Sequence, residues 1–263
     1  MRNQSTLSQR PFEPPRLVGH RGAAALAPEN TLASIRAAHK ASVRWVEVDA
    51  KLAQDGVPVL MHDSKLDRTT NATGWVAYHT SEELSKLDAG YWFGVDRTKG
   101  ETGPGPQAGQ PVPTLRECLD LVRELGLGLD LEIKPDRRTE ASTAAACLEV
   151  LDEAGWTEHD PIIFTSFRTE SLRVIRDFAP GYHRGLLIWE FPDGWQDHAH
   201  DLGVVTVISD EKSLKSENHV REISGLNYPV MCYTVNDPQR AAELYSWGVS
   251  GIVTDDPVGL AGV

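Results

Sequence analysis

Cysteine is scarce in this 263-residue sequence, and its placement does not suggest a disulfide framework. Cys118, Cys147 and Cys232 are odd in number and far apart along the chain. Two of them fall on the apolar faces of predicted helices. We therefore expect buried free thiols in a protein that resides in a reducing compartment.

Long apolar segments are also missing. No apolar run approaches the ~20 residues that a membrane-spanning helix requires. Residues 1–15 are polar and contain proline, and they show no apolar core of a signal peptide. We therefore expect a cytoplasmic protein without stable membrane insertion. Residues 1–15 are expected to form a flexible N-terminal extension.

Positive charge is in deficit. The chain has 26 Lys and Arg against 38 Asp and Glu, a formal net charge of −12. This balance weighs against nucleic acid or an anionic membrane as a partner. It is also unfavourable for a phosphate substrate unless a bound divalent cation reverses the local field. The hydrophobic content of 40% is ample for a core and argues against disorder.

The predicted elements alternate between strand and helix. Eight strands, nearly all followed by a helix, are expected at 17–20, 45–52, 127–133, 162–166, 184–189, 204–209, 230–235 and 251–254. This alternation in a chain of one-domain length predicts an α/β fold of the (β/α)8 TIM-barrel type. A doubly wound open sheet is the alternative. The lack of a glycine-rich nucleotide fingerprint after the first strand weakens it.

One segment breaks the alternation. Residues 64–110 are rich in turns and contain Tyr91-Trp92-Phe93, followed by the Gly/Pro stretch 103–106. The segment follows a strand end, so we expect it to lie over the C-terminal mouth of the barrel as a lid or small insertion. Residues 16–263 would then form a single domain. The sequence does not indicate an oligomeric state.

Charged and imidazole side chains gather at the ends of the first predicted strands. They are His20, Arg21, Glu47, Asp49, His62, Glu132 and Lys134. Buried charge is costly unless it is paired or bound to a metal. The C-terminal strand ends of such barrels carry the catalytic groups. Two imidazoles, three acids and two fixed cations are the groups that metal-assisted cleavage of a phosphate ester needs.

Strand periodicity predicts how some of these groups meet. Residues alternate across a strand, so Glu47 and Asp49 share the face that points into the barrel. Asp55-Gly56 is a hairpin signal, and the second strand should return through it toward His62. A two-residue turn would set Asp49 directly opposite His62, with Cβ atoms about 4.5–5.5 Å apart.

The residue types suggest roles. Glu47, Asp49 and Glu132 supply hard oxygen ligands, which suit Mg²⁺ or Ca²⁺ better than Zn²⁺. A divalent cation held there would bind a phosphate oxygen and offset developing negative charge.

The remaining charged groups would act on the substrate. Arg21 can grip a second phosphate oxygen with its planar fork, and Lys134 can add a point charge. His20 and His62 are natural general base and general acid because free imidazole titrates near neutrality. The sequence does not decide which histidine takes which role.

Other residues near the strand ends are candidates for supporting parts. Asp130 is expected to support the site or fill a barrel layer rather than bind metal. Glu29 is expected to stabilise a helix start or to orient the neighbouring arginine. Phe167, Trp189 and Tyr233 could line an apolar wall for the substrate.

Ten short segments, taken together, resemble one family. They are Gly19-His20-Arg21-Gly22, Ala27-Pro28-Glu29-Asn30-Thr31, Glu47-Val48-Asp49, Asp55-Gly56-Val57-Pro58-Val59 with His62-Asp63, Leu66-Asp67-Arg68-Thr69-Thr70, Leu87-Asp88-Ala89-Gly90, Pro113-Thr114-Leu115, Leu131-Glu132-Ile133-Lys134, Tyr233-Thr234-Val235-Asn236 and Thr254-Asp255-Asp256-Pro257. These segments extend from residue 19 to residue 257 and occur in the order found in that family. The chain therefore resembles a glycerophosphodiester phosphodiesterase.

The resemblance implies a barrel of the phosphatidylinositol-phospholipase-C-like kind. It implies a divalent metal held by Glu47, Asp49 and Glu132, with His20 and His62 as the acid/base pair. It further implies hydrolysis of small glycerophosphodiesters to sn-glycerol 3-phosphate and an alcohol. The attacking group would be either a substrate hydroxyl or water. At Tyr233 many relatives carry tryptophan, a difference that concerns substrate preference.

Two other functions are considered beside this one. A lysophospholipase D or related phospholipase would need an exposed apolar rim for its tailed substrate, of which Tyr91, Trp92 and Phe93 could supply only part. A non-catalytic phosphoester-binding protein would have no need of two acid/base histidines, and this sequence has both.

Overall fold

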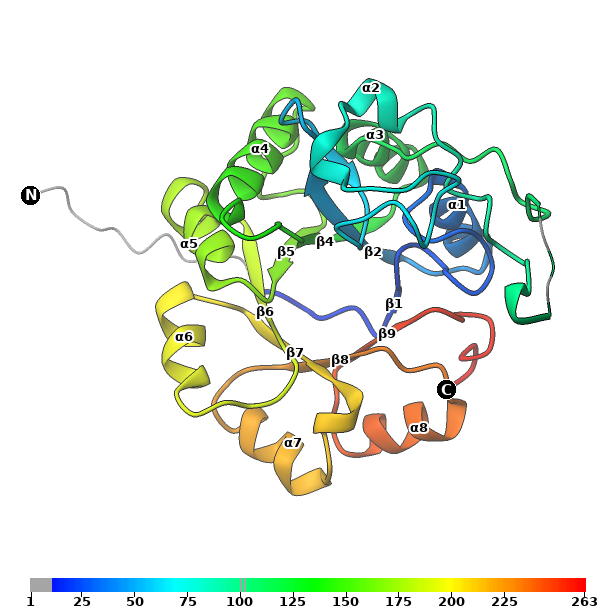
Figure 1. Ribbon diagram of the computed structural model, residues 1–263. Coiled ribbons are helices and arrows are strands. Elements are labelled where there is room, and N and C mark those ends of the chain that lie inside the picture. Colours follow the sequence, from blue (N-terminus) through cyan, green and yellow to red (C-terminus); the bar gives the residue numbers. More distant parts are fainter. Residues whose placement is uncertain (1–10, 100, 102) are drawn as a thin grey trace, which may run out of the picture.

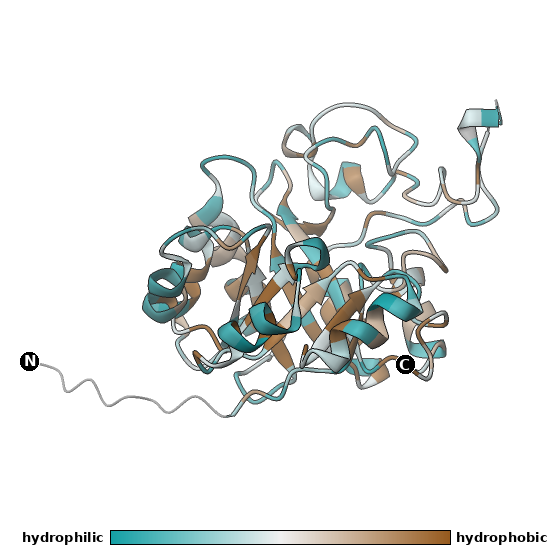
Figure 2. Ribbon diagram, turned by 90° about the horizontal axis from the view of Figure 1, so that it is seen from below, coloured by the Kyte–Doolittle hydropathy of each residue, from teal (hydrophilic) through white to brown (hydrophobic). Residues whose placement is uncertain are grey.

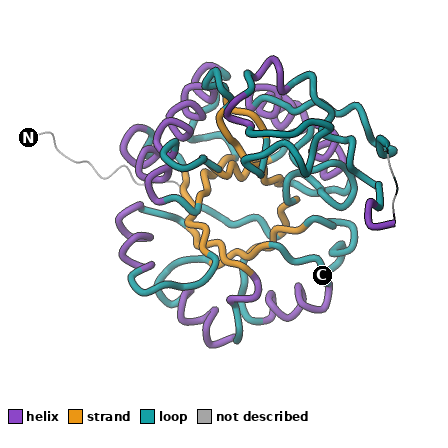
Figure 3. Tube along the Cα trace, viewed as in Figure 1, coloured by secondary structure: helices purple, strands orange, loops and turns teal. Residues whose placement is uncertain are grey.

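The centre of the molecule is a closed ring of parallel strands (Figures 1 and 3). The computed structural model describes residues 11–99, 101 and 103–263. The ring runs β1-β9-β8-β7-β6-β5-β4-β2, and pairing of β1 with β2 closes it. Its strands are β1 (Leu17–Gly19), β2 (Trp45–Leu52), β4 (Gly128–Ile133), β5 (Ile162–Ser166), β6 (His183–Ile188), β7 (Thr206–Asp210), β8 (Val230–Tyr233) and β9 (Gly251–Thr254). The predicted (β/α)8 barrel is confirmed, and the open-sheet alternative is wrong.

Helices surround the ring and cover its outer face. They are α1 (Leu32–Lys40), α3 (Leu115–Leu125), α4 (Glu140–Glu153), α5 (Thr169–Phe178), α6 (Trp195–Leu202), α7 (Glu217–Ser224) and α8 (Pro238–Ser246). Figure 2 shows mostly hydrophobic residues, in brown, along the strands in the middle and many hydrophilic residues, in teal, along the outer helices. Several helices begin at side-chain caps, among them Thr114 with Glu117 at α3 and Asp237 before Pro238 at α8.

Side-chain alternation in β2 separates packing from chemistry. Val46 and Val48 are fully buried in the apolar core shared with the flanking helices. Glu47 and Asp49 therefore face the barrel interior, as predicted. The two carboxylates thus lie on the opposite side of the strand from that apolar core.

The hairpin after β2 differs from the prediction by one residue. Strand β3 (Pro58–Leu60) returns antiparallel to β2 after a turn of residues 54–56, in which Gly56 adopts a φ of +80°. This turn has three residues rather than two. As a result the Met61 amide donates to the Asp49 carbonyl at 3.0 Å, and His62 lies one residue further along. The predicted direct opposition of Asp49 and His62 was wrong.

The segment between β3 and α3 forms a small insertion beside the barrel. It contains the short helices η1 (Val76–Tyr78), α2 (Ser81–Leu84) and η2 (Arg97–Lys99). It has its own apolar cluster, which includes Leu66, Val76 and Leu84. In Figure 1 this cyan and green segment lies over the side of the ring that carries α1 and α3.

The other end of the barrel is contacted by the N-terminal residues. The Phe12 ring lies 5.1 Å from the ring of His183 and 6.4 Å from that of Trp45, measured between centroids. Most of the flexible extension expected over residues 1–15 falls outside the described residues. Within the described part of the chain, no helix has the length and apolar character needed to cross a membrane.

Candidate active site

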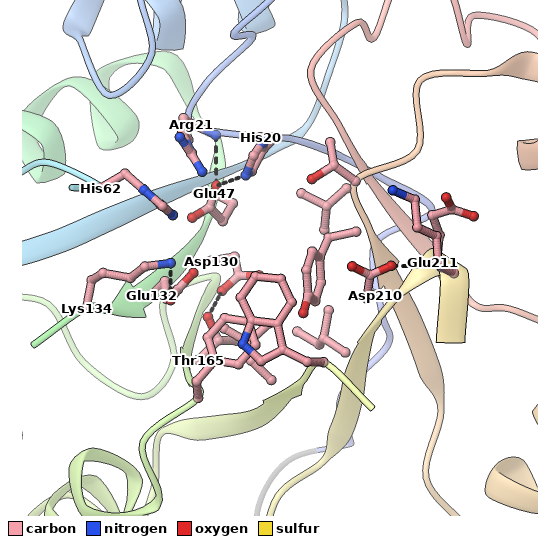
Figure 4. Close-up of a pocket in the computed structure, with 18 residues that line it drawn as sticks. His20, Arg21, Glu47, His62, Asp130, Glu132, Lys134, Thr165, Asp210 and Glu211 are labelled. Carbon is pink, nitrogen blue, oxygen red and sulfur yellow. Dashed lines mark hydrogen bonds and ion pairs between the residues drawn. The ribbon is translucent and has the colours of Figure 1, made fainter. Parts of the chain in front are cut away.

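A cavity of about 270 Å³ lies where the barrel strands end (Figure 4). Six of the seven predicted site residues line it, namely His20, Arg21, Glu47, His62, Glu132 and Lys134. The seventh, Asp49, is 1% exposed and lies against Glu47 and Glu132. The structure thus brings together all seven residues, which span more than a hundred positions of sequence.

Two glycines shape the turn that carries His20 and Arg21. A Cβ atom added at Gly19 would lie 1.9 Å from the Gly22 carbonyl oxygen, and Gly22 has a φ of +89°. Arg21 itself adopts a φ of +50°, which is uncommon for a residue with a side chain. The tight turn lets the Arg21 amide donate to Glu47 Oε2 at 2.8 Å. It thereby aims the side chains of His20 and Arg21 at the acids of β2.

The three acids converge because β2 and β4 pair in parallel. Asp49 and Glu132 are register partners in this pairing, and Glu47 precedes Asp49 on the same face. One oxygen from each of the three carboxylates lies within 4.8 Å of the others. All three side chains are buried, so water does little to separate their charges.

This crowding separates the acidities of the three carboxyl groups. Burial raises the pKa of Glu132 to about 8, and the neighbouring Asp49 charge adds to the effect. Burial and the charges of Asp49 and Glu132 likewise raise the pKa of Glu47 well above its usual value. Burial also opposes ionisation of Asp49, but Lys134 and Arg21 outweigh it and hold its pKa well below the usual range.

The donor set fits a divalent cation. Glu47 Oε1 is buried and has no hydrogen-bond partner among the described residues. A buried carboxylate oxygen without a partner is costly, and a bound cation would satisfy it. Three carboxylates offer the hard oxygen ligands that Mg²⁺ and Ca²⁺ take. Glu47, Asp49 and Glu132 could therefore hold such an ion.

Each histidine is held by a carboxylate through its Nδ1 atom. His20 Nδ1 lies 2.6 Å from Asp255 Oδ1, and His62 Nδ1 lies 2.7 Å from Asp63 Oδ1. Because a carboxylate accepts, Nδ1 carries the proton in each ring and Nε2 is left for other contacts. His20 Nε2 lies 4.0 Å from Glu47 Oε2. Figure 4 shows Glu47 between the two imidazoles.

The positively charged side chains of Arg21 and Lys134 each contact Asp49 and one further carboxylate. Arg21 Nη1 donates to Glu29 at 2.5 Å, and Arg21 Nε lies 3.3 Å from Asp49 Oδ2. Lys134 Nζ lies 2.8 Å from Glu132 and 3.3 Å from Asp49. The expectation that Glu29 orients the neighbouring arginine agrees with its contact.

One side of the cavity is aromatic. The rings of Phe167 and Trp189 stack with centroids 4.9 Å apart, and the ring of Tyr233 meets both edge-on. All three line the cavity, as expected for an apolar wall. Trp189 is 63% exposed at the rim.

Neither Asp130 nor the range 64–110 belongs to the group of three acids, although Asp130 lines the same cavity. Asp130 lies outside the group of three acids and accepts a hydrogen bond from Thr165 Oγ1 at 2.6 Å. Burial raises its pKa to about 7. Trp92 and Phe93 pack against each other, and neither lines the cavity. Among the described residues of the range 64–110, none contributes to the cavity wall.

Comparison with known proteins decides the family. Residues 20–258 match the Glycerophosphoryl diester phosphodiesterase family. The chain belongs to this family. It is a phosphoric diester hydrolase, and the family resemblance noted in the sequence is confirmed.

Several relatives of this phosphodiesterase match it over most of their length. A glycerophosphodiester phosphodiesterase of Bacillus subtilis (strain 168) is 33% identical over 247 residues, covering 91% of this chain and 83% of the relative. One from Caldanaerobacter subterraneus subsp. tengcongensis is 29% identical, covering 92% and 94%. A phosphodiesterase of Oleispira antarctica, solved in complex with the product sn-glycerol-3-phosphate, has a TM-score of 0.85 and 33% identity. The match covers 94% of this chain and 95% of that one.

Three residues near the histidines were not identified from the sequence as part of the site. Asp255 and Asp63 hold the imidazoles, and Asn236 in turn donates to Asp255 Oδ2 at 2.8 Å. Asp63 could have been found, since it directly follows a site histidine. Asn236 and Asp255 stand in two of the segments that carry the family resemblance, but their contacts depend on the pairing of β9 with β1 and β8 and could not be predicted from the residues alone.

Proposed function

We propose that this phosphodiesterase hydrolyses glycerophosphodiesters to sn-glycerol 3-phosphate and an alcohol, using one divalent cation, Mg²⁺ or Ca²⁺, and two histidines. The observation that carries the proposal is the placing of His20 and His62. Both line one cavity with the three acids, and each has its Nδ1 atom held by a carboxylate.

The cation would be held by Glu47, Asp49 and Glu132. When bound, it supplies a positive charge that offsets the negative charge developing on the phosphate. Asp49 supports this assignment because it stays ionised between its two cationic neighbours, Arg21 and Lys134.

Arg21 and Lys134 bind the phosphate in this proposal. Both line the cavity, and both already contact carboxylates there, so their charged ends are held in position before substrate arrives. The fork of Arg21 suits two oxygens of one phosphate, whereas the ammonium of Lys134 acts as a point charge.

The imidazoles transfer protons through Nε2. One of them takes the proton from the attacking oxygen, which belongs either to water or to a hydroxyl of the substrate. The other gives a proton to the leaving alcohol oxygen. Asp255 and Asp63 keep the Nδ1 proton of His20 and His62 in place, so that Nε2 is the reacting nitrogen.

The small-molecule substrate is supported by the neighbour from Oleispira antarctica, which was solved with sn-glycerol-3-phosphate. In this chain Phe167, Trp189 and Tyr233 line one side of the cavity, where they offer an apolar wall to a glycerol backbone. A tailed lipid substrate receives less support, because Trp92 and Phe93 pack on each other in the insertion.

The cytoplasm is the compartment that we propose for this enzyme. Cys118, Cys147 and Cys232 are free and buried, and burial raises the pKa of the Cys118 thiol to about 12. Buried thiols of this kind are compatible with a reducing compartment.

The test is release of glycerol 3-phosphate from glycerophosphocholine with and without EDTA. We expect EDTA to abolish turnover and added Mg²⁺ or Ca²⁺ to restore it. We also expect His20→Ala and His62→Ala each to lower kcat by at least about 10²-fold, the usual worth of a general acid or base.

The matched control is His39→Ala, since His39 is exposed in the last turn of α1 and does not line the cavity. Thermal unfolding verifies that each variant is folded. Near-normal turnover in either site variant would remove that histidine from the mechanism, and full activity in EDTA would remove the cation.

A further inference from the structure

Arg68, in the insertion, binds two carboxylates at once. Its Nη1 and Nη2 atoms donate to Glu29 Oε2 and Oε1 at 2.6 and 2.8 Å. Its Nε and Nη2 atoms donate to Asp63 Oδ2 and Oδ1 at 2.7 and 3.0 Å. Paired contacts between a guanidinium and a carboxylate fix geometry as well as charge. A side chain that is 44% exposed is therefore held in one orientation.

The two carboxylates belong to different parts of the molecule. Glu29 lies in the loop between β1 and α1, is 9% exposed and also binds Arg21. Asp63 follows the hairpin and holds His62. Arg68 thus connects the loop that carries one functional cation to the carboxylate that orients one imidazole.

We propose that Arg68 is a positioning residue for proton transfer by His62 and that it acts through Asp63. This inference rests on the proposed function of His62. A carboxylate with only one engaged oxygen can rotate and lose the alignment of its hydrogen bond. Arg68 engages both oxygens of Asp63, so the plane of the carboxylate is fixed and Oδ1 stays directed at His62 Nδ1. The imidazole Nε2 atom is then aimed at the cavity.

The other histidine has an equivalent arrangement built from the barrel itself. Asp255 binds His20 through Oδ1, and its Oδ2 accepts from Asn236 Nδ2. Asp255 and Asn236 follow adjacent strands, β9 and β8, so the ring of strands supplies both contacts. Residue His62 lies beyond β3, outside the ring. The carboxylate that holds His62, Asp63, therefore receives its second contact from Arg68 of the insertion.

The burial of its partner Glu29 distinguishes the contacts of Arg68 from an ordinary surface ion pair. Exposed pairs such as Arg116 with Asp120, at 3.6 Å, contribute little. Arg68 instead contacts Glu29, which is nearly buried, and its hydrogen bonds lower the pKa of both Glu29 and Asp63 although burial opposes this. Loss of the guanidinium would leave Asp63 with His62 as its remaining partner among the described contacts.

The experiment is a double-mutant cycle on the full-length enzyme, with Mg²⁺ or Ca²⁺ present. Arg68→Gln is made in the wild-type and in the His62→Ala background, and kcat and KM are measured for release of glycerol 3-phosphate from glycerophosphocholine. In the wild-type background we expect kcat to fall roughly 10- to 100-fold, the usual effect of a group that orients a catalytic residue. KM should change by less than about threefold, since Arg68 does not touch the substrate cavity.

In the His62→Ala background Arg68→Gln should lower kcat no further, because the residue through which it acts is gone. An equal fold-loss in both backgrounds would overturn the proposal, since it would mean that Arg68 acts elsewhere. The matched control is Arg116→Gln, whose side chain has similar exposure, 46%, and should leave kcat unchanged.

The proposal stays testable if Arg68→Gln does not fold. Arg68→Lys keeps the charge but cannot engage two carboxylates in this two-pronged manner, so we expect an intermediate loss of kcat that also disappears in the His62→Ala background. Full activity of Arg68→Lys would overturn the requirement for a guanidinium. Failure of the proposed function gives a different result, because His62→Ala alone would then retain near-normal turnover.

Discussion

Asp49 differs from its acidic neighbours because polar and cationic groups surround it. Arg21 and Lys134 each approach it at 3.3 Å, and Asn30 binds both its side chain and its amide. Its charge is therefore stable without any ion. Glu132, by contrast, has a raised pKa and becomes costly to ionise until a cation arrives. The permanent negative charge of Asp49, next to acids that can still ionise, would attract a divalent cation.

The sequence predicted which residue types form the site and on which strand face they lie, but it did not predict all of their contacts. Alternation along β2 placed Glu47 and Asp49 on one face, and the structure confirms this. The partner of His20 could not be predicted in the same way. Asp255 is 235 positions away and reaches His20 only because Gly19 is in register with Thr254.

Asp255→Asn tests the contact that holds His20. Asn236 Nδ2 donates to Asp255 Oδ2, so an asparagine would direct its oxygen to Asn236 and its NH₂ group to His20 Nδ1. The imidazole would then carry its proton on Nε2, which could no longer accept one, and the protonated ring would lose the carboxylate that stabilises its charge, so either role of His20 would suffer. We expect kcat to fall by at least about 10²-fold while thermal unfolding stays near that of the wild type.

The control for this variant is the next residue. Asp256 accepts a hydrogen bond from the Gly259 amide and does not line the cavity, so Asp256→Asn should leave kcat unchanged. Equal kcat values for the Asp255→Asn variant and the wild type would show that orientation of His20 by this carboxylate is dispensable.

At the scale of elements, local signals were more reliable than pairing signals. The capping box of α3 is visible in four residues of sequence, from Thr114 to Glu117, because a cap depends only on its own helix turn. The register of the β2–β3 hairpin was not predicted correctly, because Asp55-Gly56 occurs in turns of different length. A turn of three residues moved His62 beyond its predicted partner, and the imidazole reaches the cavity from a loop instead.

Thr114→Ala tests the contribution of one such cap. The Glu117 amide donates to Thr114 Oγ1, and the threonine amide donates to Glu117 Oε2. Loss of a capping hydroxyl costs about 1 kcal/mol of stability. In a domain of this size that corresponds to a decrease in Tm of about 2–4 °C.

Differential scanning calorimetry measures this change, with Thr114→Ser as the control that keeps the hydroxyl. Since Thr114 does not line the cavity, kcat should be unaffected. An unchanged Tm in the alanine variant would mean that the cap contributes nothing to α3.

At the scale of the whole molecule, strand–helix alternation predicted the architecture of the barrel. It did not predict the position of the insertion. Periodicity identified all eight strands of the ring, since each carries a strong apolar signal. It could not predict where the insertion lies, because its fold depends on a small separate cluster around Leu66 and Val76. The net charge of −12 was reconciled with a phosphate substrate only by assuming a bound cation.

Metal binding should stabilise the whole fold in a pH-dependent way. Without metal, Glu132 has a folded pKa of about 8 against a usual value of 4.5, so it holds its proton more tightly in the folded state. Its contribution to stability is fully present below pH 4.5 and is lost as the pH rises through about 8. Metal binding requires the ionised form, so protons and metal compete.

We therefore expect the increase in Tm caused by millimolar Mg²⁺ or Ca²⁺, relative to EDTA, to grow with pH and to level off above about pH 8. The apparent affinity should weaken roughly tenfold per pH unit below that value if Glu132 dominates. Thermal unfolding between pH 5.5 and 9 measures the effect. Glu132→Gln is the control, and in it the increment should be small at every pH. A pH-independent increment in the wild type would contradict the competition.

The contact between His20 and Asp255 has a consequence for the order in which the site is assembled. The two residues are 235 positions apart, and they meet only when β9 pairs with β1. A folding intermediate in which β2 and β4 are already paired would hold the three clustered acids and still lack the carboxylate that contacts His20. Closure of the ring between β1 and β9 is therefore the step that completes the surroundings of this imidazole.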